Sequence, residues 1–298
     1  MAASITPVTV AITTLDRPDA LARCLRSLAA GSATPAEVVV VDQSRERTAR
    51  PVVESADGLP EVRYLHDDGV GLGRGQNIAV RAARHPTVAV LDDDCVAGSG
   101  WVSGVGDRLD DADLVGGRVL PLADSRADVV PVSSRTSERP VAFNERTVPW
   151  AIGSGNNFAL QRDWFERVGG CDERLGPGAP GLGGLDMDLF YRLVRAGASA
   201  RYDPELIVYH EQKSPEERLA RRVPYGFGMA AACVLWRIEG GDRFAGRVFV
   251  AWLRLRVAAL ARAALRGRWR AAHEEVLVLV GTGRGVLYGL RVARRHRD

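Results

Sequence analysis

The sequence predicts an α/β fold: a doubly wound, mostly parallel sheet flanked by helices, with a helical C-terminal extension. Three observations support it. Short apolar runs alternate with segments of helical periodicity over the first two-thirds of the chain. Two of these runs are continuously apolar, which is typical of strands covered on both faces. From residue 216 onward the pattern turns helical and rich in arginine.

The elements follow in order. Residues 8–12 form a β-branched run, which predicts the first strand. Apolar side chains then recur at positions 21, 24, 25 and 28, between Pro18 and Gly31, which suit the two ends of a helix. The run EVVVV at 37–41 predicts the second strand and residues 62–65 the third. A helix over 76–84 and a buried strand over 87–91 complete this series.

The later part of the chain is less regular. Residues 121–150 are rich in proline, serine and charge, and we expect a connecting excursion there. Helices are expected over 164–168 and 188–196, and a strand over 200–208. We therefore predict two regions: an α/β domain, residues 1–212, and a basic, amphipathic helical region, residues 213–298.

The charge of the chain is distributed unevenly. Of 298 residues, 46% are hydrophobic and 26% charged, which is ordinary for a globular protein, and the net charge is +3. Residues 1–212 carry −8 and residues 213–298 carry +11, with 17 arginines after Lys213. This asymmetry indicates an anionic surrounding for the second region.

The cysteines and the N-terminal residues indicate the cellular compartment of the protein. The four cysteines are far apart and form no CxxC pair, so neither a zinc cluster nor a disulfide framework is predicted. The first residues lack a basic stretch followed by an apolar one, so we expect no secretory signal. A cytoplasmic protein is the resulting expectation.

Polar side chains follow three of the predicted strands. Thr14, Asp16 and Arg17 come after the first strand, Asp42 after the second, and an acidic triplet after the strand at 87–91. Ligands of parallel α/β sheets bind beyond the carboxyl ends of the strands. We therefore expect these side chains to converge on one ligand site. For a single acid such as Asp42, a turn or cap is the alternative.

The acidic triplet Asp92, Asp93 and Asp94 indicates a divalent cation. In extended geometry Asp92 and Asp94 would point to one side and Asp93 to the other. Adjacent carboxylates repel one another unless a cation or hydrogen-bond donors compensate. Mg²⁺ and Mn²⁺ bind one or two carboxylates together with phosphate oxygens. The alternative is a solvated acidic turn.

These segments together resemble the family-2 glycosyltransferases of the GT-A fold. The matching stretches are TLDRP at 14–18, VDQS at 41–44, GLGRGQN at 71–77, LDDD at 91–94 and LDMDL at 185–189. They occur in the family's order over residues 5–212. The resemblance implies a GT-A-like domain over residues 1–212 that binds a nucleoside-diphosphate sugar. Leu15 and Leu185 depart from the family, which often has an aromatic residue and a glutamate there.

The resemblance also implies roles for individual residues at the nucleotide-sugar site. Thr14 and Asp42 would contact the base, with Asp42 accepting from a uracil or thymine imide, and Arg74 would approach the pyrophosphate. The full set implied to bind the nucleotide sugar is Thr14, Asp16, Arg17, Asp42, Arg74, Asp92 and Asp93.

For the metal and the base, the resemblance implies three residues. Asp94 would ligate Mn²⁺ or Mg²⁺, and His210, which follows the last strand, is a second metal candidate, with Glu211 and Gln212 as alternatives. Asp186 would be the general base that takes the proton of an acceptor hydroxyl. The alternative for Asp186 is a helix N-cap, and for His210 a hydrogen-bonded structural residue.

The implied activity is inverting, metal-assisted sugar transfer to an acceptor hydroxyl. The acceptor would be a glycan, a lipid-linked molecule or a small molecule. Two alternatives stay open: a sugar nucleotidyltransferase, and a nucleotide-sugar-binding or membrane-adaptor protein with little or no catalysis.

The basic C-terminal region has its own alternatives. Its helices either lie on a membrane surface, which would make the protein peripheral at the inner face, or pack on the α/β domain. Residues 244–265 are too charged to span a bilayer, because each central arginine costs about 2.5–3.5 kcal/mol. Since no DNA- or RNA-binding module is recognisable, we expect no nucleic-acid partner.

Overall fold

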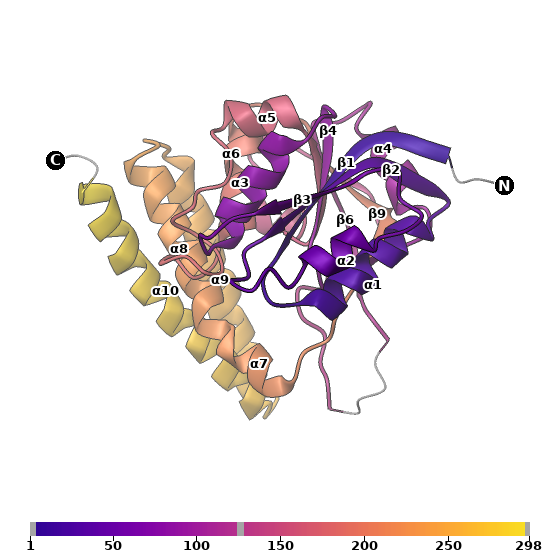
Figure 1. Cartoon of the computed structure of the whole chain (residues 1–298). Coiled ribbons are helices and arrows are strands. Elements are labelled where there is room, and N and C mark those ends of the chain that lie inside the picture. Colours follow the sequence, from indigo (N-terminus) through magenta and orange to yellow (C-terminus); the bar gives the residue numbers. More distant parts are fainter. Residues whose placement is uncertain (1–3, 124–127, 296–298) are drawn as a thin grey trace. The chain divides into compact units, whose positions relative to one another are not determined.

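The computed structural model describes residues 4–123 and 128–295. Its chain divides into two compact units (Figure 1). The first comprises the described parts of Met1–Cys171 together with Leu189–Lys213, and the second comprises Asp172–Asp188 with the described part of Ser214–Asp298. The segment 172–188, which carries Asp186, therefore groups with the C-terminal helices and not with the sheet.

A mixed sheet of nine strands forms the centre of the first unit within the described residues. The strand order is β3-β2-β1-β4-β8-β6-β9-β5, and β7 pairs with β9. The strands are β1 (Ser4–Thr14), β2 (Ala33–Asp42), β3 (Val62–His66), β4 (Thr87–Leu91), β5 (Cys95–Ala97), β6 (Leu114–Pro121), β7 (Val141–Phe143), β8 (Asn157–Gln161) and β9 (Ala200–His210).

Parallel pairing determines where the strands end. The four neighbours β3, β2, β1 and β4 are all parallel, and so is the pair β6–β9. Strand β8 runs antiparallel between β4 and β6, and β5 and β7 run antiparallel to β9. The predicted mostly parallel α/β sheet is confirmed, and the carboxyl ends of β1, β2 and β4 lie at one edge.

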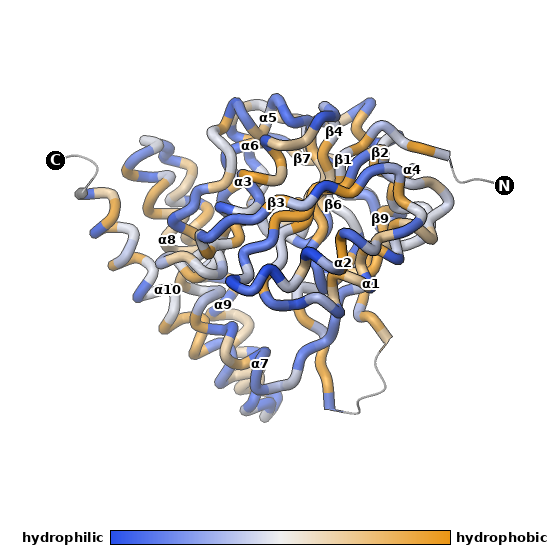
Figure 2. The backbone as a smooth tube through the Cα atoms, viewed as in Figure 1, coloured by the Kyte–Doolittle hydropathy of each residue, from blue (hydrophilic) through white to orange (hydrophobic). Residues whose placement is uncertain are grey.

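Helices flank this sheet, and its core lies against α1 (Figure 2). The helices of this part of the chain are α1 (Pro18–Ala29), α2 (Arg50–Glu54), α3 (Leu72–Ala82), α4 (Trp101–Arg108), the 3₁₀ turn η1 (Pro149–Ala151), α5 (Arg162–Arg167) and α6 (Leu185–Arg195). The predicted apolar face of α1 is buried, and it joins β1, β2 and α4 in one core cluster. The boundary between the two units falls within α6.

Two regions differ from the sequence-based expectation. Helix α3 begins at Leu72, four residues before the expected start at 76. Its glycines lie inside the first turn because α3 packs tightly on β1: a Cβ on Gly75 would lie 2.3 Å from Thr13 Cγ2. Strand β6 was not predicted, since Gly116 and Gly117 interrupt its apolar run. A Cβ on Gly116 would lie 2.6 Å from the Ile152 carbonyl oxygen, so only glycine fits there.

The second unit is helical, and glycines let its helices approach closely. Its helices are α7 (Pro215–Ala220), α8 (Arg222–Ile238), α9 (Phe244–Leu265) and α10 (Trp269–Arg295). A Cβ on Gly281 or on Gly285 of α10 would lie 2.1 Å from a carbonyl oxygen of α8, that of Val223 or Phe227 respectively. A side chain larger than hydrogen is therefore excluded at these two positions.

One stretch among the described residues, 269–294 in α10, is long and apolar enough to cross a membrane by length and composition. Of its most apolar window, 33% is buried inside the structure. A helix packed within a protein can have the same length and composition.

Two glycine substitutions in α10, one at a close contact and one at an open position, test the packing of α10 on α8. Gly285→Ala places a methyl group against the α8 backbone, and we expect it to destabilise the protein by about 1–3 kcal/mol. Gly283→Ala, two residues away, has nothing within 4 Å and should be neutral or stabilise by up to about 1 kcal/mol. Urea unfolding monitored by circular dichroism measures both. Equal stability of the two variants would contradict the close approach.

Candidate active site

The ends of β1 and β4 are joined through buried polar side chains. Thr14, the last residue of β1, pairs in register with Asp42 at the end of β2. The Thr14 hydroxyl donates to Asp93 Oδ2 over 2.7 Å, and both side chains are buried. The expected convergence at the carboxyl edge therefore exists for these residues.

The acidic triplet forms a turn, so the expected extended geometry was wrong. The Cys95 amide donates to the Asp92 carbonyl oxygen over 3.1 Å, which closes the turn between β4 and β5. As a result Asp93 and Asp94 face the same cation: Arg17 Nη1 lies 3.2 Å from an oxygen of each. The side chain of Asp92 is only half-buried.

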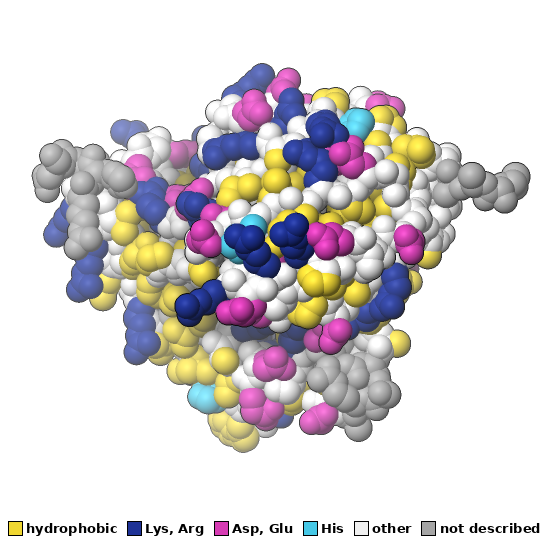
Figure 3. Space-filling view, viewed as in Figure 1, with side chains coloured by type: hydrophobic (Ala, Val, Ile, Leu, Met, Phe, Trp, Pro, Cys, Tyr) yellow, Lys and Arg dark blue, Asp and Glu magenta, His cyan; other side chains and the backbone are white. Residues whose placement is uncertain are grey.

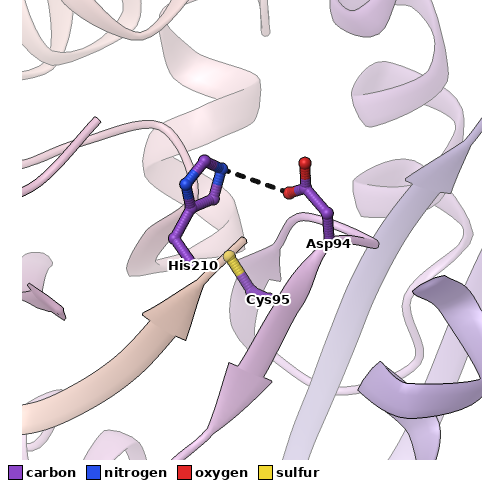
Figure 4. Close-up of side chains that lie close together, drawn as sticks. All are labelled: Asp94, Cys95 and His210. Atoms are coloured by element: carbon purple, nitrogen blue, oxygen red, sulfur yellow. Dashed lines mark ion pairs between the residues drawn. The ribbon is translucent and has the colours of Figure 1, made fainter. Parts of the chain in front are cut away.

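Asp94 lies against the end of β9 (Figure 4). Strand β5 pairs antiparallel with β9, and this register sets His210 opposite Cys95. His210 Nε2 consequently lies 3.2 Å from Asp94 Oδ1. Both side chains are buried, with about a twentieth of each exposed. Residues more than a hundred positions apart thus share one buried polar contact.

Lys213 is a member of this cluster that the sequence analysis missed. Its Nζ lies 3.1 Å from Asp94 Oδ2 and 3.2 Å from Glu211 Oε1. The one signal for it in the sequence was that it is the only lysine in a chain with 39 arginines. The two alternatives to His210 are engaged elsewhere: Glu211 also pairs with Arg23, and Gln212 donates to the Leu122 carbonyl oxygen.

The pKa values of the two buried aspartates are shifted in opposite directions. Burial would raise the pKa of Asp94, but His210, Lys213 and Arg17 outweigh it, and the pKa is lowered. Burial raises the pKa of Asp93, and the hydrogen bonds from Thr14 and Arg17 only partly oppose it. Asp94 is therefore the carboxylate held ionised for binding a cation.

Asp94 and His210 fit a divalent metal ion. A carboxylate oxygen of Asp94, Cys95 Sγ and a ring nitrogen of His210 all lie within 4.8 Å of one another. His210 Nδ1 is buried and has no hydrogen-bond partner, which leaves that ring incompletely satisfied. Mg²⁺ and Mn²⁺ prefer oxygen ligands such as the Asp94 carboxylate, and Mn²⁺, as a first-row transition metal ion, also binds imidazole. Burial raises the pKa of the Cys95 thiol far above its usual value, which disfavours the thiolate that a metal would need. Asp94 and His210 are thus suitable ligands, and Cys95 is not.

Asp42 is held by donors of its own unit. Its carboxylate accepts from the Ser44 amide and hydroxyl, from the Ala49 amide and from the Tyr64 hydroxyl. These four bonds occupy the acceptor positions of a carboxylate, so a base imide would have to replace one of them. Burial, the bond to Asp42 and the charge of Asp42 raise the pKa of Tyr64 to about 12.

Arg74 belongs to a second cluster. It pairs with Asp67 through two bonds of 2.7 Å, and Gln43 donates to the same carboxylate over 3.1 Å. Gln43 also accepts from the Gly71 amide, which ties the end of β2 to the start of α3. Asp16 is not brought into either cluster: it is exposed in the turn before α1, at φ +55°.

Asn156 lies in the stretch GSGNN at 153–157, which resembles a family segment that shapes the sugar and acceptor sites, but no individual role was predicted for it. It precedes β8, it is buried, and neither its amide nitrogen nor its amide oxygen has a hydrogen-bond partner. The Cys95 thiol donates to the backbone carbonyl oxygen of Asn156 over 3.8 Å. Asn156 therefore adjoins the residues that fit a metal ion. A buried amide with two unsatisfied groups indicates a place where a polar ligand binds.

In the second unit, Asp186 lies in the first turn of α6. Asp188, two residues on, is buried and accepts from Trp236 Nε1 over 2.7 Å, whereas Asp186 is half-exposed. The preceding loop packs on α8, because a Cβ on Gly184 would lie 2.6 Å from the Gly228 backbone. Asp188 therefore helps to hold the helix, and Asp186, whose Oδ1 accepts from the Met187 amide over 3.0 Å, is the more exposed of the two carboxylates.

Comparison with known proteins agrees with this geometry. The profile of the family "Glycosyl transferase family 2" matches residues 9–169. The hyaluronan synthase of Pasteurella multocida is 24% identical, over 70% of this chain and 25% of its own length. The pre-mycofactocin glycosyltransferase of Mycobacterium tuberculosis is 28% identical, over 88% of this chain and 56% of its own. The chain thus spans between a quarter and just over half of these relatives.

A solved structure shows the same fold. The mannosyltransferase PcManGT of Pyrobaculum calidifontis, in complex with GDP-Man and Mn²⁺, superimposes with a TM-score of 0.61 at 16% identity. The match covers 93% of this chain and 87% of that one. The predicted GT-A-like architecture is confirmed. Because the family profile covers more than half of the sequence, the chain belongs to glycosyl transferase family 2.

Proposed function

We propose that the protein is an inverting glycosyltransferase that moves a sugar from a nucleoside-diphosphate sugar to an acceptor hydroxyl. One observation carries the proposal: the buried pair Asp94–His210, linked through Arg17 and Asp93 to Thr14, at the carboxyl edge of a family-2 sheet. Such an edge is where α/β proteins bind nucleotides.

Asp94 and His210 would hold a divalent ion, Mn²⁺ or Mg²⁺. When bound, such an ion neutralises the charge that develops on the leaving diphosphate. That a fold relative was solved with GDP-Man and Mn²⁺ supports this assignment. Arg17 and Lys213 face the same carboxylate, so they are suitably placed to bind diphosphate oxygens once a divalent ion occupies Asp94.

The remaining predicted residues would bind the donor. Thr14 and Asp42 lie at the adjoining strand ends and would contact the base, and Asp92 and Asp93 would lie near the ribose. The unsatisfied amide of Asn156 would bind a hydroxyl of the transferred sugar. Arg74 would reach the pyrophosphate only by leaving Asp67, and Asp16 only by movement of its turn.

Asp186 would act as the general base. It takes the proton of the acceptor hydroxyl while that oxygen forms a bond to the anomeric carbon. The bond from this carbon to the diphosphate oxygen breaks, and the nucleoside diphosphate leaves from the opposite face. A single displacement of this kind inverts the anomeric configuration. Asp186 is half-exposed whereas Asp188 is buried, and this difference in exposure supports the choice between the two.

A panel of nucleoside-diphosphate sugars tests the proposal as a whole. With Mn²⁺ and simple glycan acceptors, we expect one donor class to release nucleoside diphosphate together with a glycosylated product. Nuclear magnetic resonance of the product should show the inverted anomer. Retention of configuration would contradict the mechanism. Binding of a donor without any turnover would favour the binding-protein alternative, and pyrophosphate release from a nucleoside triphosphate would favour a nucleotidyltransferase.

Substitution of Asp94 tests the metal site. We expect Asp94→Asn to weaken Mn²⁺ binding at least 100-fold, since it removes a direct ligand and even outer residues contribute about 10–100-fold. Cys95→Ser is the matched control and should bind Mn²⁺ as tightly as the wild type. Electron paramagnetic resonance of Mn²⁺, titrated in the presence of nucleoside diphosphate, measures both without relying on turnover. Undiminished binding by Asp94→Asn would refute the assigned ligand.

Substitution of Asp186 tests the base. Asp186→Asn should lower kcat by about 10²–10⁴-fold, because the amide cannot take the proton, while donor affinity measured by calorimetry stays unchanged. In Asp188→Asn the amide oxygen still accepts from Trp236, so most of the activity should remain. If Asp188→Asn lost turnover and Asp186→Asn kept it, the roles of the two carboxylates would be exchanged.

A further inference from the structure

The exposed faces of α9 and α10 carry arginines and apolar side chains but no acid. Helix α9 contains no Asp or Glu, and α10 contains two, Glu274 and Glu275. Nine arginines between residues 244 and 294 are exposed: Arg247, Arg254, Arg262, Arg266, Arg268, Arg270, Arg284, Arg291 and Arg294. In Figure 3, basic and hydrophobic side chains lie together over these helices.

Both acids of α10 face inward and are already neutralised. Glu274 Oε2 lies 2.9 Å from Arg222 Nε and 3.1 Å from Arg218 Nη2. Glu275 pairs with Arg256, which lies over the ring of Trp252 at 4.9 Å. Among the described residues, Arg218, Arg222 and Arg256 are thus paired with acids, and the nine exposed arginines are not.

The exposed apolar residues follow the same faces at helical spacing. On α9, Val250, Val257 and Leu265 are interleaved with Arg247 and Arg254, and Leu255, which is 36% exposed, lies off this series. On α10, Trp269, Val276, Val280 and Leu287 are interleaved with Arg284 and Arg291. Spacings of three, four, seven and eight place each series on one side of its helix. We call these two stripes and the turn between them the basic apolar face.

The turn between α9 and α10 is the most exposed part of this face. Leu265 is 88% exposed and Trp269 is 72% exposed, and they flank Arg266, Gly267 and Arg268. A leucine and a tryptophan held in water beside Arg266 and Arg268, with Arg270 next in sequence, are costly for a surface that stays in water. Tryptophan with arginine is the combination that suits the boundary between lipid headgroups and acyl chains.

We propose that the basic apolar face binds the surface of an anionic lipid bilayer, with the α9–α10 turn inserted among the headgroups. Charge complementarity selects this occupant. The arginines pair with lipid phosphates, while Leu265, Trp269 and Leu287 enter the apolar boundary. A second copy of the same face would bring two sets of unpaired arginines together. Nucleic acid would satisfy the arginines but would leave the large apolar side chains in water.

The face lies on the bilayer and does not cross it. The apolar stretch of α10 is held to α8 by Gly281 and Gly285, whose close contacts leave no room for lipid on that side. Arg284, which is exposed, lies near the middle of the stretch. Only one side of the helix is therefore free for lipid, which is the arrangement of an interfacial helix.

Flotation of the full-length chain with vesicles tests the proposal. We expect the protein to float with vesicles of phosphatidylglycerol and phosphatidylcholine but not with phosphatidylcholine alone, and binding to weaken as salt rises from about 0.1 M to about 1 M. Recovery of the protein in the soluble fraction with anionic vesicles would overturn the proposal. The experiment needs no donor, so its failure leaves the transferase proposal untouched.

Matched variants locate the surface. Replacing Arg254, Arg284 and Arg291 by Gln should weaken binding at least tenfold, since each basic residue near an anionic surface contributes roughly fivefold. The control replaces Arg26, Arg139 and Arg146, exposed arginines of the other unit, by Gln and should bind as the wild type does. Equal loss in both triple variants would overturn the assignment to this face.

Separate variants and a fluorescence measurement test the insertion of the α9–α10 turn. Leu265→Ser with Trp269→Ser should also weaken flotation at least tenfold, with Ile5→Ser, 61% exposed, as the control. Brominated lipids should quench the fluorescence of the wild type and not that of Trp269→Phe, because Trp269 is the exposed tryptophan of the described chain. Absence of quenching would overturn insertion. Salt-resistant self-association through these residues, or tighter binding to duplex DNA than to vesicles, would overturn the choice of partner.

Discussion

Burial of the two carboxylates Asp93 and Asp94 is the constraint on which the rest of the site depends. A buried charge is stable only when paired and hydrogen-bonded, and here Thr14, Arg17, His210 and Lys213 supply the partners. These partners come from the end of β1, the start of α1 and the end of β9. The strand order of the sheet is therefore tied to the electrostatics of the site: loss of one partner leaves a buried charge unpaired.

The second constraint is close contact between backbone segments in the helical unit. Glycines of α10 lie against α8, and Gly184 lies against Gly228, so the loop before α6 is held by the C-terminal helices. The Asp188–Trp236 bond fastens the same segment. The carboxylate proposed as the base thus depends on the basic tail for its position. In the part of that tail that the structure describes, Arg218, Arg222 and Arg256 are paired with acids, and the nine exposed arginines from Arg247 to Arg294 are not.

Much of this could be predicted from local patterns. The strands at 37–41 and 87–91 and the apolar face of α1 were predicted because continuous or periodic apolarity is a property of a few adjacent residues. The extended acidic triplet was wrong because a turn brings Asp93 and Asp94 onto one arginine. Strand β6 was missed because Gly116 and Gly117 interrupt its apolar run. These glycines are required by close contact with neighbouring backbone, which a local pattern does not show.

By itself the sequence determined the α/β class, the residues gathered at the carboxyl edge, the family and the split between an acidic and a basic region. Each depends on residue type and order along the chain. Tertiary structure alone decided that Lys213 neutralises Asp94, that Asp42 is enclosed by four donors and that Asn156 is buried unsatisfied. The reason is physical: burial and pairing depend on distances between segments up to a hundred or more residues apart, and those distances exist only once the sheet has formed.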